Sequence, residues 1–217
     1  MIPCELSGVE RVLCLGAHCD DIEVGCGGTV LQLLEQSQEI EFYWFVFCSN
    51  PRRAREAKRS ADVFLKAAKR KTVVVKSLRD GFLPYVGPPV KEAFEKLKAT
   101  FAPDLIFTHT RNDLHQDHRL ICELTWNTFR DHLILEYEIP KFDGDLGAPN
   151  FFVPLSDGQA RKKVNGLIRH FGSQRNKQWF SGNLFYSLMR LRSIEVASPT
   201  QYAEAFYCRK MRLGKSG

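Results

Sequence analysis

Residues 11–36 read RVLCLGAHCDDIEVGCGGTVLQLLEQ, and this stretch decides the fold. Its first part, Arg11–Ala17, is an apolar run with the length of a buried strand. Its last part, Thr29–Gln36, has the composition of a helix. Gly27 and Gly28 precede that helix, and we expect them to let its first turn lie close to the strand. The stretch therefore predicts the first strand and the first helix of a βαβ unit.

The same alternation of strand and helix continues along most of the chain. Further strands are expected at 40–48, 72–77, 104–109 and 202–209, and further helices within 51–71, at 90–100, from about 118, at 159–170 and at 183–191. The proline- and glycine-rich stretch after Glu138 predicts a loop. This order predicts an α/β protein, a Rossmann-like three-layer sandwich with a mostly parallel sheet. Because residues 1–217 contain no repeat or linker, we expect a single domain.

Composition indicates a globular protein without a membrane span. Of the 217 residues, 44% are apolar and 26% are charged, which is not the composition of a disordered chain. The longest strongly apolar run, Phe42–Cys48, is too short to cross a bilayer. Residues 1–5 lack the features of a secretion signal, and the seven cysteines form no Cys-x-x-Cys pair. We therefore expect a cytoplasmic protein with reduced thiols.

The net charge of +6 comes from one part of the chain. Residues 51–71 contain nine basic and two acidic side chains, a balance of +7, and the remaining residues have a balance of −1. Apolar residues recur at helical spacing in this window, which predicts an amphipathic helix with a basic face. Two interpretations stay open: a solvated face, or a site for an anionic substrate group near the helix start. Nucleic-acid binding is not expected, because the window lacks a stripe of aromatic residues interleaved with the basic ones.

Two polar clusters follow two of the expected strands. Residues 17–23, AHCDDIE, follow the first strand, and residues 109–118, HTRNDLHQDH, follow the strand at 104–109. Together they hold four of the six histidines and five carboxylates. In an open α/β sheet, ligands bind beyond the carboxyl ends of the strands. We therefore expect the active site at the C-terminal ends of these strands.

The residue types in the two clusters are those of a catalytic metal site. A His and an Asp three positions apart, joined by a His from a distant loop, form a typical ligand set for catalytic zinc. Bound zinc lowers the pKa of water to about 7, a second carboxylate can accept the proton of that water, and a second imidazole can stabilise an oxyanion. Single residues of this kind often only cap helices. Asp20 and Asp21, however, are adjacent and repel each other unless a cation lies beside them.

The clusters also carry a family resemblance. AHCDDIEVGCGGT (17–29) resembles the signature A-H-P-D-D-x-x-x-G-C-G-G-T of the LmbE-like (PIG-L) family of zinc-dependent N-acetylglucosaminyl deacetylases. HTRNDLHQDH (109–118) is similar to the second signature of that family, H-x-x-x-D-x-H-x-D-H. RAREAKRSADVFL (53–65), RDGFLP (79–84) and YAEAF (202–206) resemble further blocks. The resemblance thus extends over nearly the whole chain and implies one LmbE-like deacetylase domain.

Position by position, the resemblance implies a role for each central residue of the two clusters. It implies three metal ligands, His18, Asp21 and His118. It implies Asp20 as the general base that accepts a proton from the attacking water. It implies His115 as the imidazole that stabilises the oxyanion and protonates the leaving amine.

The resemblance implies supporting roles for other residues. Asp117 matches the carboxylate that orients His115, and Arg53 matches an arginine that contacts the substrate. His109 and Asp113 match positions with structural roles behind the metal ligands.

Some residues depart from the family pattern or fall in blocks without an assigned task. Cys19 replaces the usual proline, and we expect a small buried side chain that points away from the metal. Trp179, in a polar loop, is a candidate platform for a sugar ring. Ser173, Gln174 and Glu204 lie in blocks that resemble the family but carry no assigned role.

The leading functional prediction is a metal-dependent hydrolase that removes the N-acetyl group of an amino sugar or its conjugate. The amide chemistry and the sugar class follow from the resemblance. Two alternatives stay open: hydrolysis of another small amide in thiol-cofactor or antibiotic biosynthesis, and a non-catalytic metal-binding module. The expected cofactor is Zn²⁺, with ferrous iron as the alternative. The expected partner is a small N-acetylated sugar with an anionic group held by Arg53, and the sequence leaves both the substrate and homo-oligomerisation open.

Overall fold

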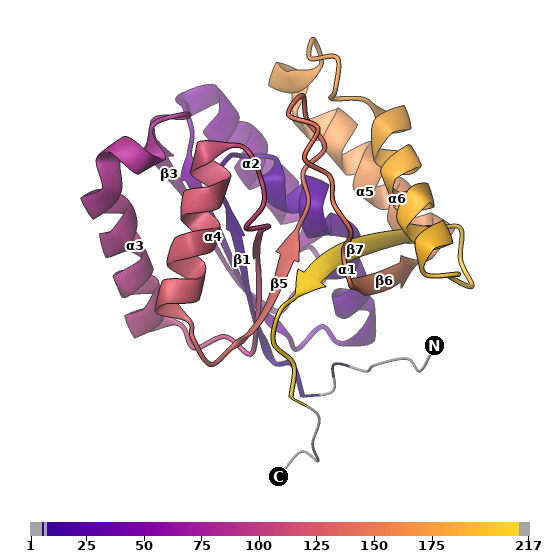
Figure 1. Ribbon diagram of the computed structural model, residues 1–217, viewed down its shortest axis with the longest axis horizontal. Helices are drawn as coiled ribbons and strands as arrows, with labels where there is room; N and C mark the ends of the chain where they lie inside the picture. Colours follow the sequence, from indigo (N-terminus) through magenta and orange to yellow (C-terminus); the bar gives the residue numbers. More distant parts are fainter. Residues whose placement is uncertain (1–5, 7, 213–217) are drawn as a thin grey trace.

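In the computed structural model, residues 6 and 8–212 are described, and seven of their strands form one sheet (Figure 1). The strand order is β3-β2-β1-β4-β5-β7-β6. The strands are β1 (Arg11–Gly16), β2 (Glu41–Cys48), β3 (Arg70–Leu78), β4 (Leu105–His109), β5 (Leu133–Tyr137), β6 (Phe151–Leu155) and β7 (Tyr202–Cys208). The first five strands pair in parallel, and β7 runs antiparallel to both β5 and β6.

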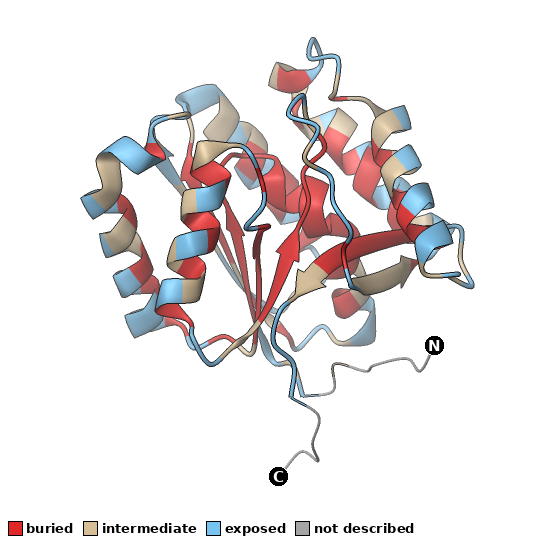
Figure 2. Cartoon of the chain, viewed as in Figure 1, coloured by how far each residue is buried: buried red, intermediate tan, exposed pale blue. Residues whose placement is uncertain are grey.

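Six α-helices flank this sheet. They are α1 (Asp21–Gln36), α2 (Pro51–Phe64), α3 (Gly87–Thr100), α4 (Gln116–Thr128), α5 (Asp157–His170) and α6 (Gly182–Glu195), with short 3-10 helices η1 (Leu83–Val86) and η2 (Gly172–Gln174). Side chains of β1 and β2 alternate between two apolar clusters. One cluster packs against α1, α2, α5 and α6, and the other packs against α3 and α4. The expected three-layer α/β fold is confirmed, and Figure 2 shows the buried strands at its centre.

Helix α1 begins at Asp21, not at Thr29 as expected, and the glycines lie inside it. A Cβ atom on Gly25 would lie 2.2 Å from the Tyr137 ring. A Cβ atom on Gly28 would lie 2.4 Å from Leu155 Cδ1. These glycines therefore allow the helix to pack against the sheet without a side chain between them. Because of the earlier start, only residues 17–20 separate the first turn of α1 from β1.

The basic helix α2 is shorter than the basic window that predicted it. Its N-cap residue is Asn50, whose Oδ1 accepts hydrogen bonds from the amides of Arg52 and Arg53, both at 3.0 Å. It ends at Phe64, so the basic residues 66–71 lie in the following turn and in the edge strand β3.

The antiparallel part of the sheet was predicted only in part: the strand expected at 202–209 is β7, but its neighbours were not expected. Strand β5 was missed, and β6 lies in a stretch that was expected to be a loop. Strand β6 contains Pro154 and lies at the edge of the sheet, where a residue without an amide proton is tolerated. The expectation about a secretion signal concerns residues 1–5, which lie outside the described residues. Within residues 6 and 8–212, no helix combines the length and the apolar character needed to cross a bilayer.

Candidate metal-dependent active site

The two polar clusters meet at the carboxyl ends of β1 and β4, which are neighbours in the sheet. Residues 17–20 connect β1 to α1, and residues 110–115 connect β4 to α4. A pocket of about 330 Å³ opens where they meet. It is lined by residues from both clusters, from α2, from the loop after β3 and from loops of the second half of the chain: His18, Asp20, Asp21, Arg53, Asp80, His115, His118, Ile139, Lys141, Phe142, Asp143, Gln174, Lys177 and Trp179.

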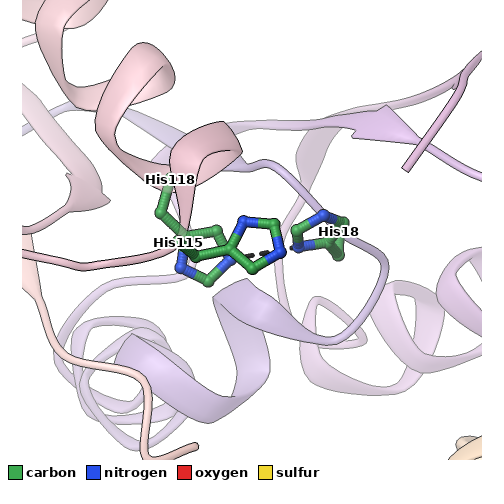
Figure 3. Close-up of side chains that lie close together, drawn as sticks. All are labelled: His18, His115 and His118. Carbon is green, nitrogen blue, oxygen red and sulfur yellow. Dashed lines mark hydrogen bonds between the residues drawn. The ribbon is translucent and has the colours of Figure 1, made fainter. Parts of the chain in front are cut away.

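The three residues expected to bind a metal lie close together. His18 Nδ1 lies 3.0 Å from His118 Nε2 and 3.4 Å from Asp21 Oδ2. His118 Nε2 lies 3.5 Å from the same carboxylate oxygen. Ligands about 2.0–2.1 Å from a tetrahedral zinc ion are roughly 3.3 Å apart, so this donor set fits a zinc ion. Figure 3 shows the His18 and His118 rings with their facing nitrogen atoms joined by a dashed line.

The protonation of these groups is shaped by burial and by neighbouring charges. Burial lowers the pKa of His118 to about 3, which leaves the imidazole neutral at pH 7. Burial disfavours the charged form of Asp21, but the imidazoles of His118, His18 and His109 hold the pKa of this carboxyl well below its usual range. A neutral imidazole and an ionised carboxylate are the forms that bind a divalent cation, so His118 and Asp21 are already in those forms. Burial lowers the pKa of His18, but the Asp21 charge and hydrogen bonds to nearby carboxylates raise it well above its usual value, so this imidazole would release a proton on binding a metal.

Other groupings of the same side chains also bring donor atoms together in the described part of the chain. One consists of His18, His115 and His118, and another of Asp21, His109 and His118. In each of them the donor atoms lie within 4.8 Å of one another. The described residues therefore form a donor-rich centre around His18 and His118.

Carboxylates contact the far side of both candidate imidazole ligands. His118 Nδ1 lies 2.9 Å from Asp113 Oδ2. His18 Nε2 lies 3.2 Å from Asp117 Oδ2 and 3.0 Å from Asp80 Oδ1. A carboxylate behind an imidazole fixes the orientation of the ring and increases its basicity toward a metal.

His109 is a buried residue that packs against two of the candidate ligands, His118 and Asp21. Its ring is fully buried and stacks on the His118 ring, with centroids 3.9 Å apart. His109 Nε2 accepts a hydrogen bond from the amide of Ala17 at 3.0 Å and lies 3.2 Å from Asp21 Oδ2. These contacts agree with the supporting position expected for this residue.

Asp20 lies beside the three candidate ligands but has different partners. Although it is the N-cap residue of α1, its side chain does not cap the helix. Asp20 Oδ1 instead accepts a hydrogen bond from the Arg53 guanidinium at 2.5 Å, and Asp20 Oδ2 is buried without a partner. Burial raises the pKa of this carboxyl, whereas the Arg53 charge opposes the increase. A carboxylate with one free oxygen and a raised pKa is suited to accept a proton.

His115 faces the same pocket from the start of α4 (Figure 3). Its ring centroid lies 4.8 Å from that of His18 and 4.6 Å from that of His118. His115 Nδ1 accepts a hydrogen bond from the amide of Asp117, so in the neutral ring the proton is on Nε2. Burial and the nearby His18 lower the pKa of His115. The ring is thus held as a neutral donor.

The Asp117 carboxylate has contacts other than the one that the resemblance implies. It accepts hydrogen bonds from the amides of Gly81 and Leu83, at 2.7 and 3.1 Å, and it contacts His18. Asp117 lies in the first turn of α4, and its hydrogen bond with the Gly81 amide shows that its side chain is directed toward the loop that precedes η1. The link to His115 is made by the Asp117 backbone amide. The role of the carboxylate in orienting His115 stays a prediction.

Arg53 lies in the pocket, but carboxylates of the protein itself already neutralise its charge. Its guanidinium contacts Asp20 and lies 3.8 Å from Asp80 Oδ2. The Asn50 side chain already binds the first free amides of α2, so the helix start is occupied as well. Arg52 and Arg55 are exposed, and Arg52 lies 3.6 Å from Glu56. These contacts favour the solvated interpretation for most of the basic face.

Several residues of the pocket were not predicted from the sequence. Asp80, Lys141 and Lys177 come from three separate loops, and only Asp80 falls in a block that resembles the family. Cys19 agrees with its expectation: the side chain is fully buried, and its thiol donates a hydrogen bond to the carbonyl of Cys48. Burial raises the pKa of this thiol to about 12.

The fold and the site define a class, an α/β protein with a candidate His/Asp metal centre at the carboxyl ends of its parallel strands. The family model described as PIG-L, GlcNAc-PI de-N-acetylase, matches residues 13–129, which is more than half of the chain. The protein therefore belongs to the PIG-L (LmbE-like) deacetylase family. A search of curated proteins gave no significant match.

Several solved structures share the fold of this chain. The conserved protein TT1542 from Thermus thermophilus is 16% identical, with a TM-score of 0.75 over 95% of this chain and 97% of that one. The N,N′-diacetylchitobiose deacetylase from Pyrococcus horikoshii is 18% identical, with a TM-score of 0.66 over 92% and 83%. GalB, the 4-carboxy-2-hydroxymuconate hydratase from Pseudomonas putida KT2440, is 13% identical, with a TM-score of 0.74 over 96% and 99%. At these identities the likeness shows the fold alone.

Proposed function

We propose that the protein is a metal-dependent amide hydrolase that removes the acetyl group of an N-acetylated amino sugar or its conjugate. One observation carries this proposal. Three donor atoms of His18, Asp21 and His118 lie 3.0–3.5 Å apart, with an unpartnered Asp20 oxygen and the His115 ring lining the same pocket. A structural metal site requires neither a free carboxylate oxygen nor a second imidazole donor.

The proposed reaction divides the work among these residues. His18, Asp21 and His118 would hold a divalent cation, and when bound this cation would lower the pKa of a water molecule and polarise the acyl carbonyl. Asp20 accepts the proton of the attacking water through its free oxygen. His115 donates a hydrogen bond to the oxyanion and relays the proton taken up by Asp20 to the departing nitrogen as the C–N bond breaks, so that both side chains return to their starting forms. The products are acetate and a free amine.

The proposal of zinc rests on the ligand types, and the proposal of a sugar substrate rests on similar proteins and on Trp179. Two imidazole nitrogens and one carboxylate oxygen are a common ligand set for catalytic zinc. The family description names a GlcNAc-PI de-N-acetylase, and one structural neighbour is named for diacetylchitobiose, so both names refer to N-acetylated sugars. Trp179 lines the pocket and offers an aromatic face to a sugar ring. We also propose a cytoplasmic location, which the buried, reduced thiols among the described residues support.

A panel assay tests the proposed function. The zinc-loaded protein is incubated with N-acetylglucosamine, N,N′-diacetylchitobiose and N-acetylglucosaminyl conjugates, and released acetate is measured. We expect release from at least one compound. We also expect His115→Ala to lower kcat by about 10² or more while the bound metal is retained. If no compound releases acetate, or if His115→Ala is as active as the parent, the proposed deacetylase function is wrong.

A further inference from the structure

Gln174 is a buried pocket residue with an unused hydrogen-bond acceptor. It is the last residue of η2, its exposed fraction is 3%, and it lines the same pocket as the candidate metal ligands. Its Oε1 atom is buried and has no hydrogen-bond partner. Because buried polar atoms are nearly always paired, an unpaired one at a pocket requires an explanation.

The orientation of the Gln174 amide is fixed by a short relay that begins on α2. The Ser173 hydroxyl donates to Glu56 Oε2 at 2.5 Å, and the Ser173 amide donates to Glu56 Oε1 at 2.9 Å. Because the hydroxyl proton of Ser173 is used in this way, its oxygen is free to accept from Gln174 Nε2, which lies at 3.0 Å. The Gln174 nitrogen therefore faces Ser173, and Oε1 cannot exchange places with it without breaking the relay.

A complementary atom of the same pocket is also unpaired. Arg53 Nε is buried without an acceptor, and Arg53 lies one turn before Glu56 on α2. Besides Asp20 Oδ2, the pocket residues thus include one acceptor and one donor that are both held by α2 and both without partners. A polyol offers hydroxyl protons to the acceptor and hydroxyl oxygens to the donor, so one such molecule can satisfy both atoms. A carboxylate or phosphate could not, because it has no proton to donate to Gln174 Oε1.

We propose that Gln174 is a specificity-determining residue that accepts a hydrogen bond from a hydroxyl group of the substrate, with Arg53 Nε donating to the polyol part of the same substrate. The inference rests on the proposed function for its substrate, and it narrows the substrate to a sugar with a recognised hydroxyl. A site built to bind a hydroxyl discriminates strongly against an analogue that lacks it. A water molecule bound between the two atoms is the competing explanation.

Binding experiments test this proposal without relying on turnover. The dissociation constants of N-acetylglucosamine and its 3-, 4- and 6-deoxy derivatives are measured by titration calorimetry for the parent protein, Gln174→Met and Ser173→Ala. Methionine keeps the size of the side chain but removes the acceptor. Gln178→Met is the matched control, because Gln178 is exposed in the same loop and does not line the pocket.

We expect Gln174→Met to weaken binding of N-acetylglucosamine about five- to ten-fold and to leave one deoxy derivative unaffected. Ser173→Ala frees the Gln174 side-chain amide to rotate, so it should reduce the difference in affinity between N-acetylglucosamine and that deoxy derivative. Gln178→Met should leave all dissociation constants unchanged. Equal changes for all four sugars, no change, or no binding of N-acetylglucosamine to the parent would overturn the inference. Acetate release is scored separately. Gln174-dependent binding without acetate release would contradict only the proposed function, and acetate release that is insensitive to Gln174 would contradict only this inference.

Discussion

At the scale of single residues, Asp20 and Asp21 are adjacent carboxylates in opposite environments. Asp21 Oδ2 lies within 3.5 Å of nitrogen atoms of His18, His109 and His118, and these imidazoles favour its ionised form. Asp20 faces Arg53 and keeps one oxygen unpaired, and burial raises its pKa. Two neighbouring carboxyl groups whose environments separate their pKa values are suited to different roles. Asp21 is placed as a ligand and Asp20 as a base.

Substitution of Asp20 should separate these two roles. We expect Asp20→Asn to retain the metal, because the three candidate ligands are unchanged, and to lose a factor of about 10² to 10⁴ in kcat, because an amide cannot accept the proton. The metal content is measured by elemental analysis and the rate by acetate release. Activity within a few-fold of the parent at full metal occupancy would assign the base to another residue.

Arg53 gives a second prediction at this scale. Since its guanidinium is paired with Asp20, we expect Arg53→Ala to lower kcat by a similar factor for a charged substrate and for its uncharged analogue. Kinetics on one such pair are the measurement. A selective ten-fold rise in KM for the charged member, about 1.4 kcal/mol, would instead support an anion-binding role for Arg53.

At the scale of secondary structure, four of the five parallel strands could be predicted from the sequence, but strand β5 and the start of α1 could not. The buried strands β1, β2 and β4 are continuous apolar runs, which is why their positions were predicted to within a few residues. The start of α1 was missed because the residues that require glycines inside the helix, such as Tyr137 and Leu155, are distant in the sequence.

The candidate site was likewise predicted only in part from the sequence. The motifs predicted which side chains meet at the strand ends, because neighbouring parallel strands bring their following loops together. The motifs did not predict Asp80 beside His18, or Lys141 beside Asp113, because these contacts depend on loops without a repeating pattern. They also gave no indication that the Asp117 carboxylate would contact His18.

Glu204 joins three elements and gives a prediction about stability. It is buried in β7 and accepts hydrogen bonds from the Gly28 and Thr29 amides of α1 and from Lys163 of α5, at 2.6–2.8 Å. Glu204→Ala would leave the Lys163 charge buried without its carboxylate. We expect a loss of about 3–5 kcal/mol in the free energy of unfolding, measured by denaturant titration.

The matched control for Glu204 is a surface ion pair. Glu39 is exposed and pairs with Lys69, so Glu39→Ala should change the free energy of unfolding by less than about 1 kcal/mol. If Glu204→Ala and Glu39→Ala had the same free energy of unfolding, the prediction that the Glu204–Lys163 ion pair stabilises the packing of β7, α5 and α1 would be wrong.

At the scale of the whole molecule, the position of the site follows from the strand order. The chain builds β1, β2 and β3 toward one edge and then returns to place β4 and β5 on the other side of β1. The loops after β1 and β4 therefore diverge to opposite sides and leave a crevice between them. Both candidate ligand loops open onto this crevice. The basic residues of the 51–71 window lie mainly outside it, which explains how a net charge of +6 coexists with an acidic centre.

Metal binding should stabilise the whole fold, since the candidate ligands come from loops that follow two different strands. At a free zinc concentration 100 times the dissociation constant, we expect about 2.7 kcal/mol of stabilisation and therefore a higher Tm than in the chelated protein. Thermal unfolding with and without a chelator is the measurement. The variant with alanine at His18, Asp21 and His118 should show no such difference, and a zinc-dependent Tm in that variant would place the ion elsewhere.

The central claim is that His18, Asp21 and His118 bind one catalytic metal ion. Anomalous X-ray scattering at the zinc edge, from crystals of the zinc-loaded protein, tests it most directly. We predict one strong peak about 2.0–2.2 Å from His18 Nδ1, from an Asp21 carboxylate oxygen and from His118 Nε2, with neither His115 nor His109 in contact. A peak bound by His109 with Asp21 and His118, a peak bound by His115, or no peak in the pocket would contradict the account.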